Sequence, residues 1–434
     1  MSRLVRALLL ALMRLFYRPI RALGLEHVPA EGPALVVSNH PNGLLDPALV
    51  RLALRRPVHF LAKSTLFGNV FGRLLMNGFG GIPVYRSRDG EDTSKNDKTF
   101  ALCREHLGRG GWLALFPEGT SHSDPTMKPL KTGAARIALS TVAEGAVTGT
   151  LPIIPAGLCF DAKDDFRTAA AVTVGAPIDA VAFAKEHGTD FAAAEKLTAE
   201  IRRALGEVLL QAENHELWRG LLHVAAWTDP ASRADLALRQ VRARRLADAY
   251  HELSERDPER AEAIVETTRA LVRELAEIGV EDPLGLEDPP PLSVVQVLAP
   301  IVLLAPIAAL GALLAWLPYR GVGLLARRLS GEHTDLVGTI KLLGGLVILS
   351  VVYVAEAVAL GAWLGWAVGL SAVVAGPLTG FVALRYGERL HLRRQALKAH
   401  WLLATADQRV QAVRRRRQEV ADVVAEALKR DSGG

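Results

Sequence analysis

Short apolar runs alternate with helically spaced segments between about Pro33 and Pro177. The intervening segments, such as Asp46–Leu54 and Ser94–Leu107, have the spacing of helices with one apolar face. The runs themselves are bounded by polar or turn residues, as strands are: Ala34–Val37, His59–Ala62, Ile82–Tyr85, Trp112–Phe116, Ile153–Leu158 and Ala171–Val174. The pattern predicts an α/β domain whose helices cover a sheet, with function at the ends of the strands.

The pattern changes after about residue 190. From Phe191 to Ile278 the chain is helical and charged, and an acidic, proline-rich segment at 281–291 marks a linker. Two apolar stretches follow, Val294–Leu317 and Leu342–Leu384. Because about 20 apolar residues suffice to cross a bilayer, the first is long enough for one span and the second for two. The sequence thus predicts a helical extension followed by transmembrane helices.

The first residues also form an apolar helical segment, which Arg14 and Arg18 interrupt one helical turn apart. A secretory signal needs a longer uncharged run and a small-residue cleavage site. We therefore interpret residues 1–24 as an amphipathic helix on an anionic membrane surface, with an ordinary packed helix as the alternative. Pro19 is expected to end or kink this helix.

Composition and charge favour a membrane partner. Half of the 434 residues are hydrophobic and the formal net charge is +5, a balance that favours anionic partners. No segment resembles a nucleic-acid-binding module, so we expect membrane lipids and no nucleic acid. Cys103 and Cys159 lie in apolar contexts without metal-ligand spacing, and we expect buried free thiols and no metal site.

Basic residues around the apolar stretches bear on membrane topology. They lie between the stretches and after them: Arg320, Arg327, Arg328, Lys341, Arg385, Arg389, Arg393, Arg394 and Arg414–Arg417. The positive-inside rule places both groups in the cytoplasm, yet three crossings would put the tail opposite the first domain. One resolution is that Val294–Leu317 is a hairpin, broken near Pro300 and Pro306, that never crosses. Glu356, in the second stretch, either marks a pathway or is paired inside a helical hairpin.

A candidate base follows the first predicted strand. His40 and Asp46 lie six residues apart, where Asn39 or His40 can cap the next helix and Pro41 suits its first turn. A helix N-terminus disfavours the imidazolium, and Asp46 can accept the other ring N–H and fix the tautomer. Without a serine in a strained elbow, such a pair would deprotonate a substrate hydroxyl directly. A chance pairing is the alternative.

A second block, residues 116–121, follows another predicted strand and indicates an anion site. The backbone N–H groups of Gly119 and Thr120 can face an anion, and Glu118 can bind a substrate hydroxyl or cap a helix. Three cations at strand or loop ends could hold a phosphate: Lys63, Arg86 and Lys131. Each alone is better explained by a surface ion pair. Beside a base, the three predict that a hydroxyl is deprotonated next to a bound anion.

Four blocks in order resemble those of glycerolipid acyltransferases, the family that acylates lysophosphatidic acid or glycerol 3-phosphate. They are Asn39-His40 with Asp46, Ile82–Arg86, Phe116–Thr120 and Leu151–Leu158, and the resemblance covers roughly residues 25–180. It implies an α/β domain with a mixed sheet flanked by helices, and a base, His40, with Asp46 as its partner. Arg86, Glu118 and Gly119 would hold the phosphate and glycerol part of the acceptor. Acyl-CoA or acyl carrier protein would be a co-substrate, with no bound cofactor.

Two features set the chain apart from the short bacterial members of this family. Their first block is His-x4-Asp, whereas one extra residue separates His40 from Asp46, and they end soon after the fourth block. The Asn-Gly-Leu-Leu-Asp-Pro sequence after His40 and the segment Ser121–Ser123 resemble instead a branch with C-terminal membrane segments. That branch includes glycerol-3-phosphate and dihydroxyacetone-phosphate acyltransferases. His122 is expected to be a loop or phosphate contact, not a second base.

The leading hypothesis is a membrane-bound enzyme that acylates lysophosphatidic acid to phosphatidic acid, with its catalytic domain facing the cytoplasm. Acylation of glycerol 3-phosphate, dihydroxyacetone phosphate or another lysophospholipid is the alternative within the class, and a non-catalytic membrane scaffold is the alternative outside it. The predicted parts are an amphipathic helix (1–24), an acyltransferase domain (25–190), a helical extension with linker (191–290), membrane segments (291–384) and a basic cytoplasmic helical tail (385–434).

Overall fold

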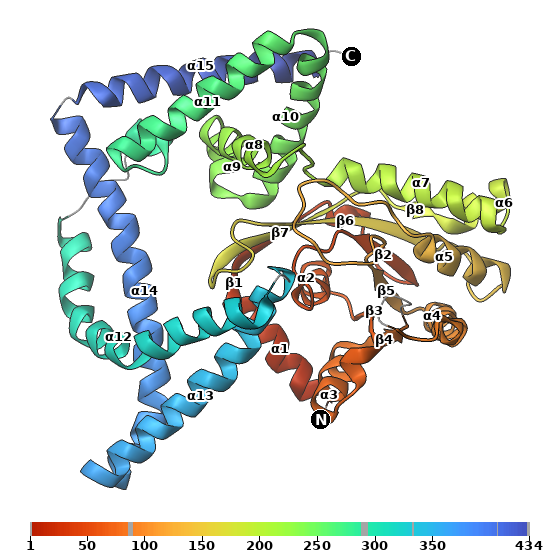
Figure 1. Ribbon diagram of the computed structural model, residues 1–434, viewed down its shortest axis with the longest axis horizontal. Helices are drawn as coiled ribbons and strands as arrows, with labels where there is room; N and C mark the ends of the chain where they lie inside the picture. The colour runs from red at the N-terminus through yellow and green to blue at the C-terminus, as the bar shows by residue number, and fades with distance from the viewer. Residues whose placement is uncertain (1, 86–89, 288–293, 332–333, 406, 432–434) are drawn as a thin grey trace. The chain divides into compact units, whose positions relative to one another are not determined.

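The computed structural model describes residues 2–85, 90–287, 294–331, 334–405 and 407–431. The chain forms two compact units, one of residues 1–222 with 231–247 and the other of residues 223–230 with 248–434. The first unit contains the sheet, and the second contains the apolar helices (Figure 1). Each unit is described by itself.

The strands of the first unit form one sheet in the order β1-β7-β6-β2-β5-β3-β4, and β8 also pairs with β6. Their bounds are β1 Tyr17–Leu23, β2 Ala34–Ser38, β3 Val58–Lys63, β4 Gly81–Val84, β5 Trp112–Leu115, β6 Pro152–Phe160, β7 Thr168–Val174 and β8 Ile178–Asp179. From β6 to β4 neighbouring strands are parallel, whereas β7 and β8 are antiparallel to β6. The mixed sheet that the family resemblance implied is confirmed.

The centre of the sheet consists of the strands that the sequence predicted most directly. β2 and β5 are buried along their whole length, which requires the uninterrupted apolar runs seen in the sequence. Leu35, Leu113 and Ile153 share one core with helices of the same face, and the alternate residues of each strand face the other side. The helices of that core are α4 Asn96–Gly108, α5 Gly133–Ala143, α6 Ala180–His187 and α7 Phe191–Val208. Helices lie on both faces of the sheet (Figure 1).

The opposite face is covered by α1 Ser2–Phe16, α2 Leu45–Leu54 and α3 Val70–Phe79, and α1 packs against both α2 and α3. In α1, Leu9, Met13 and Phe16 are buried, whereas Leu8 and Leu15 are exposed. The buried side chains identify a helix face that packs on the domain. A contact between α1 and a membrane surface stays a prediction.

The edge strand β1 was not predicted by the sequence. It pairs in parallel with β7 and contains two arginines and Pro19, with only Tyr17 fully buried. Charged residues and proline are typical of edge strands and remove the apolar alternation by which a strand is recognised. Residues 17–23, assigned above to the N-terminal helix, therefore belong to the sheet, and the helix ends at Phe16.

The helical extension predicted between Phe191 and Ile278 is present. After α7 it comprises α8 His215–Trp227, α9 Pro230–Ala234, α10 Leu236–Arg256 and α11 Pro258–Ile278. A short turn, η5 Pro283–Leu286, follows in the expected linker.

Among the described residues of the second unit, three helical segments are long and apolar enough to cross a membrane, Ile301–Ser330, Val337–Leu364 and Trp366–Ala404, with mean hydropathies of 2.2, 2.2 and 1.9. They lie in α12 Val294–Ser330, α13 Val337–Leu364 and α14 Trp366–Ala404. The longer apolar stretch is indeed two helices, which meet at Gly365. The break expected near Pro300 and Pro306 is wrong, because α12 is one helix that continues through both prolines, whereas the expectation that this segment never crosses stays a prediction. An apolar helix tolerates an internal proline where neighbouring helices and local adjustments satisfy the freed backbone groups.

Candidate active site

His40 lies just past the end of β2, where the side chain of Asn39 fixes the chain. The Asn39 amide accepts a hydrogen bond from Leu158 N at 2.8 Å and donates one to Leu158 O at 3.1 Å. It thereby continues the pairing of β2 with β6 beyond the last residue of the strand. The ring of Phe116, at the end of β5, stacks on the His40 imidazole with centroids 4.0 Å apart. Two neighbouring strands thus hold the imidazole in place.

His40 and Asp46 make the contact expected of a base and its orienting acid. His40 Nδ1 and Asp46 Oδ2 are 2.8 Å apart, and the same oxygen accepts the N–H of Asn42 at 2.7 Å. Asp46 is fully buried, whereas the imidazole is partly accessible. Burial raises the pKa of Asp46, and the hydrogen bond and charge of His40 oppose that rise. With Nδ1–H bonded to the carboxylate, Nε2 is left to accept a proton.

The turn between the two residues differs from the expected helix start. α2 begins at Leu45, so neither Asn39 nor His40 caps it and Pro41 is not in its first turn. The chain reverses at Gly43, whose φ of +51° lies in the left-handed region that glycine adopts without strain. This turn accommodates the extra residue of the block and places Asp46 in the first turn of α2. A helix N-terminus stabilises a carboxylate there.

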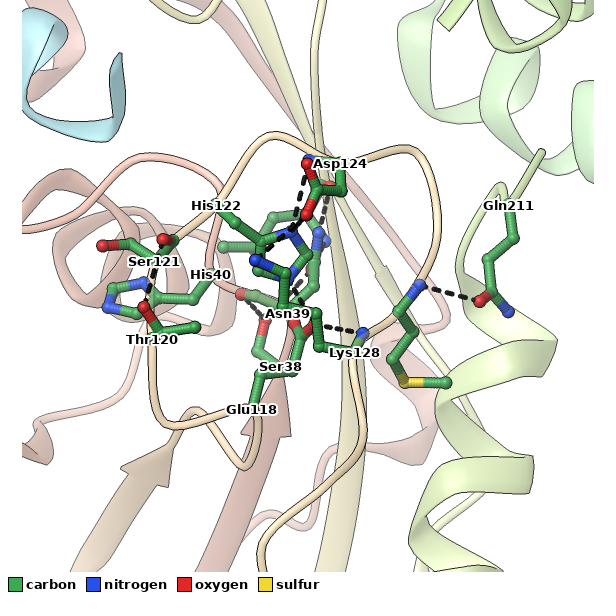
Figure 2. A network of polar contacts seen from close by, with 12 residues as sticks. Ser38, Asn39, His40, Glu118, Thr120, Ser121, His122, Asp124, Lys128 and Gln211 are labelled. Atoms are coloured by element: carbon green, nitrogen blue, oxygen red, sulfur yellow. Dashed lines mark hydrogen bonds and ion pairs between the residues drawn. The ribbon is translucent and has the colours of Figure 1, made fainter. Parts of the chain in front are cut away.

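The second block encloses a buried carboxylate. Glu118 Oε2 accepts hydrogen bonds from His122 Nε2 and from Lys128 N, while Oε1 has no hydrogen-bond partner among the described residues (Figure 2). His122 N also donates to His40 O at 3.0 Å. His122 is therefore a loop contact, as its position in the sequence predicted, and links Glu118 to the backbone of the candidate base.

The candidate anion-binding residues that the structure describes lie beyond the same edge of the sheet. The neighbouring strands β2, β5, β3 and β4 are parallel, so the segments that follow them all begin at the same end of the sheet. Lys63, at the end of β3, and Gly119, after β5, therefore both lie at this end. Gly119 has φ +67°, and a Cβ there would lie 2.8 Å from Lys131 Cε. Thr120 Oγ1 donates to Ser121 O at 3.4 Å. Arg86 falls in 86–89, outside the described residues.

Three further residues, not singled out by the sequence, hold the loop that contains His40. Lys163 Nζ donates to Pro41 O at 3.0 Å and to Ser123 Oγ at 2.6 Å, so it joins the first block to the loop after the second. Asn42 and Tyr17 both donate to Lys163 O, at 3.0 and 2.6 Å. Lys163 follows β6, which is parallel to β2, so the segments after both strands lie at the same end of the sheet. Its position after a predicted strand was the one feature of the sequence that could have indicated Lys163 as a site residue.

A cavity of about 480 Å³ opens beside these groups. Its polar lining includes His40, Glu118, His122 and Lys163, and its apolar lining includes Leu158 and Trp218. The helical extension therefore contributes to its wall through α8. A partly accessible base at the edge of a cavity with mixed polar and apolar walls suits a substrate that has both a headgroup and a chain.

Part of the chain matches a known family and known proteins. A family model described as Acyltransferase matches residues 19–158. An uncharacterized acyltransferase of Schizosaccharomyces pombe is 26% identical over 38% of this chain and 37% of its own length. Glycerol-3-phosphate O-acyltransferase 2 of Saccharomyces cerevisiae is 37% identical over 19% of this chain and 11% of its own. The chloroplastic 1-acyl-sn-glycerol-3-phosphate acyltransferase LPAT1 of Arabidopsis thaliana is 33% identical over 33% of this chain and 39% of its own.

The crystal structure of the 1-acyl-sn-glycerophosphate acyltransferase PlsC from Thermotoga maritima aligns with 46% of this chain and 78% of that chain, at 18% identity and a TM-score of 0.34. The chain spans less than half the length of the curated relatives named above. The matched segment includes all four sequence blocks and the His40–Asp46 pair. The first unit of this membrane protein therefore contains an acyltransferase domain of the glycerolipid acyltransferase family.

Proposed function

We propose that the protein transfers an acyl group from acyl-CoA or acyl carrier protein to the free hydroxyl of lysophosphatidic acid, giving phosphatidic acid. The observation that carries the proposal is the His40–Asp46 contact of 2.8 Å beside a 480 Å³ cavity. The relatives named as 1-acyl-sn-glycerol-3-phosphate acyltransferases support the acceptor.

In the proposed mechanism, His40 Nε2 removes the proton of the acceptor hydroxyl while its oxygen attacks the carbonyl carbon of the thioester. A C–O bond forms, and the carbonyl electrons move onto oxygen to give a tetrahedral intermediate. When the intermediate collapses, the C–S bond breaks and the thiolate takes the proton from the imidazolium. Asp46 accepts the Nδ1–H throughout and stabilises the imidazolium.

The remaining residues of the site would bind and position. Lys63, Arg86 and Lys131 would hold the phosphate, together with the backbone of Gly119 and Thr120. Glu118 already accepts two hydrogen bonds, from His122 and from Lys128 N. We assign it first to holding the loop beside His40, and its second oxygen to a hydroxyl of the acceptor.

Glycerol 3-phosphate is the second candidate acceptor, because two yeast glycerol-3-phosphate acyltransferases are among the relatives. Both acceptors carry a phosphate and a free hydroxyl, so the same residues would serve. The apolar part of the cavity wall, which includes Leu158 and Trp218, favours the acceptor that already has a chain.

The test is purified protein in lipid vesicles with acyl-CoA, or with acyl carrier protein, and a panel of acceptors. The panel contains lysophosphatidic acid, glycerol 3-phosphate, dihydroxyacetone phosphate and lysophosphatidylcholine. We expect release of free thiol that depends on lysophosphatidic acid, with phosphatidic acid as product. Equal thiol release without any acceptor would refute the proposal, and so would full turnover by His40→Ala.

A further inference from the structure

The charged tail packs on a helix that precedes the apolar segment. In the second unit, α15 Gln408–Asp431 lies against α11 Pro258–Ile278 (Figure 1). Arg416 forms an ion pair with Glu274 at 2.8 Å, and Arg260 forms one with Glu426 at 2.9 Å. Apolar side chains are buried on both helices: Leu271, Leu275, Val413 and Val420. This is a water-facing helix pair with an apolar seam and charged edges.

The pairing restricts how often the intervening chain crosses a membrane. α11 ends before α12 begins, and α15 begins after α14 ends, so three apolar helices separate the two partners. Two charged helices that contact each other lie on the same side of a bilayer, because moving their ionised groups through hydrocarbon is prohibitively costly. The number of complete crossings between them is therefore even.

The helices α13 and α14 have the features of a two-span hairpin. Leu342–Leu364 and Trp366–Leu384 are each about as long as a bilayer requires, and Lys341 and Arg385 flank them at the same end. At the opposite end the chain turns at Gly365, where the tryptophans on either side are exposed, Trp363 by 82% and Trp366 by 64%. Tryptophan is enriched at the membrane–water interface.

Small residues let the two helices of this hairpin pack closely near the turn. A Cβ on Gly369 would lie 2.6 Å from Ala357 O, and one on Gly361 would lie 2.8 Å from the Trp366 ring. Such stripes of small residues are common where transmembrane helices meet. The contacts continue from the turn toward the basic end, where Gly380 approaches the Tyr353 hydroxyl.

α12 meets the hairpin at its basic end. Gly311 packs on the backbone of α14 at Thr379, six residues before Arg385, and Val322 packs on Gly345, four residues after Lys341. At 1.5 Å per residue, these contacts lie within about 10 Å of the flanking charges. α12 bends, so that its first part runs beside α14 and its later part runs across it (Figure 1). Its last two turns contain Arg327 and Arg328, which belong with the other basic residues at this end.

We propose that α13 and α14 cross the bilayer as a helical hairpin, while α12 is embedded in the leaflet on the basic side and both enters and leaves on that side. α11 and α15 then stay together in water. The exposed apolar side chains of α12, among them Leu313 and Leu317, would face the acyl chains of that leaflet, and Arg327 and Arg328 its anionic headgroups. The inference concerns the second unit alone and does not depend on the reaction.

The test is the sidedness of single engineered cysteines toward a membrane-impermeant maleimide, in the full-length protein in sealed vesicles of one orientation. The native Cys103 and Cys159 are buried, and labelling of the protein without engineered cysteines gives the background signal. The variants probe the segment before α12, the end of α12, the hairpin turn and α15: Glu281→Cys, Leu329→Cys, Leu364→Cys and Gln411→Cys. We expect the first, second and fourth to react from one side and Leu364→Cys from the other.

Each alternative topology gives a different pattern. Reaction of Glu281→Cys and Gln411→Cys from opposite sides would mean an odd number of crossings and would overturn the proposal. Reaction of Leu329→Cys from the side of Leu364→Cys, or of all four variants from one side, would also overturn it.

A second measurement addresses the helix pair itself. In the membrane, Glu274→Cys with Arg416→Cys is expected to be joined by a short bis-maleimide cross-linker and to shift the band on a gel, because the native side chains bridge this gap with Nη2 and Oε1 2.8 Å apart. The control pair, Glu266→Cys with Arg416→Cys, moves one cysteine about two helical turns along α11 and is expected not to link. Absence of the link in the first pair, with the protein extracted in folded form, would refute the α11–α15 pairing. None of these readouts requires activity, so they distinguish failure of this topology from failure of the proposed reaction.

Discussion

Replacing Asp46 by asparagine tests whether the charge of this residue, and not only its shape, supports the base. In the structure one carboxylate oxygen accepts both the His40 Nδ1–H and the Asn42 N–H, and the other oxygen is buried without a partner among the described residues. An asparagine can place its carbonyl oxygen at the first position and keep both hydrogen bonds. The Asp46→Asn variant should therefore fold normally and keep the imidazole in place.

What the variant loses is the negative charge opposite the imidazolium that forms when His40 takes the proton. At an effective dielectric constant of about 20, two unit charges about 4 Å apart attract by roughly 4 kcal/mol. Since about 1.4 kcal/mol corresponds to a factor of ten in rate, we expect kcat to fall about a thousandfold. KM for the acceptor should change little, because Asp46 is fully buried and does not reach the cavity.

The assay is release of free thiol from acyl-CoA with lysophosphatidic acid, with thermal unfolding as the check on folding. The matched control is Asp161→Asn, which removes a carboxylate that lines the same cavity but pairs with Arg239 on the surface. It should leave kcat within about threefold of the wild type, because the Asp161 carboxylate pairs with Arg239 and not with His40. If Asp46→Asn kept more than a tenth of the wild-type kcat with an unchanged Tm, the proposed role of the dyad would be wrong.

Three further outcomes follow from the geometry. Gly119→Ala is expected to raise KM about tenfold, because its φ of +67° strains alanine and the new Cβ displaces Lys131, whereas Gly110→Ala, at φ +77° with open space, should not raise KM. His122→Ala should lower kcat about tenfold or more by loosening the loop bonded to the backbone of the base, and His122→Gln should recover part of the loss. Burial and nearby positive charge lower the pKa of His59 from 6.5 to about 4. The unfolded chain then binds more protons between those values, so stability should fall as pH drops from 6.5 to 4, and Tm measurements should show a weaker fall in His59→Phe.

The sequence predicted those elements whose burial repeats with a regular period. β2 and β5 are buried on both faces and appear as uninterrupted apolar runs, so their bounds agree with the structure to within a residue. β1 was not predicted, because an edge strand with two arginines and a proline has no such apolar pattern. The start of α2 was misplaced because the turn depends on the backbone angle of Gly43, which no periodicity reports.

The residues of the candidate site likewise fall into those that the sequence indicated and those that it did not. The base and its partner could be named because both lie in one short block, and their contact requires only a local turn. The engagement of Glu118 by His122, by contrast, depends on how a long loop folds back over the end of β5. Lys163 is the clearest case of a residue that the sequence did not indicate. It contacts Pro41, 122 residues earlier in the chain, because β6 lies beside β2 in the sheet.

By itself, then, the sequence determined the α/β class, the order of the four blocks, the identity of the candidate base and its acid, and the positions of the apolar segments. These are local properties, fixed by side-chain chemistry and by the periods of the helix and the strand. Only the tertiary structure decided the strand order, the engagement of Glu118, the contacts of Lys163 and the pairing of α11 with α15. Those contacts join segments far apart in the chain. They form, and stabilise the protein, only once the intervening residues have folded.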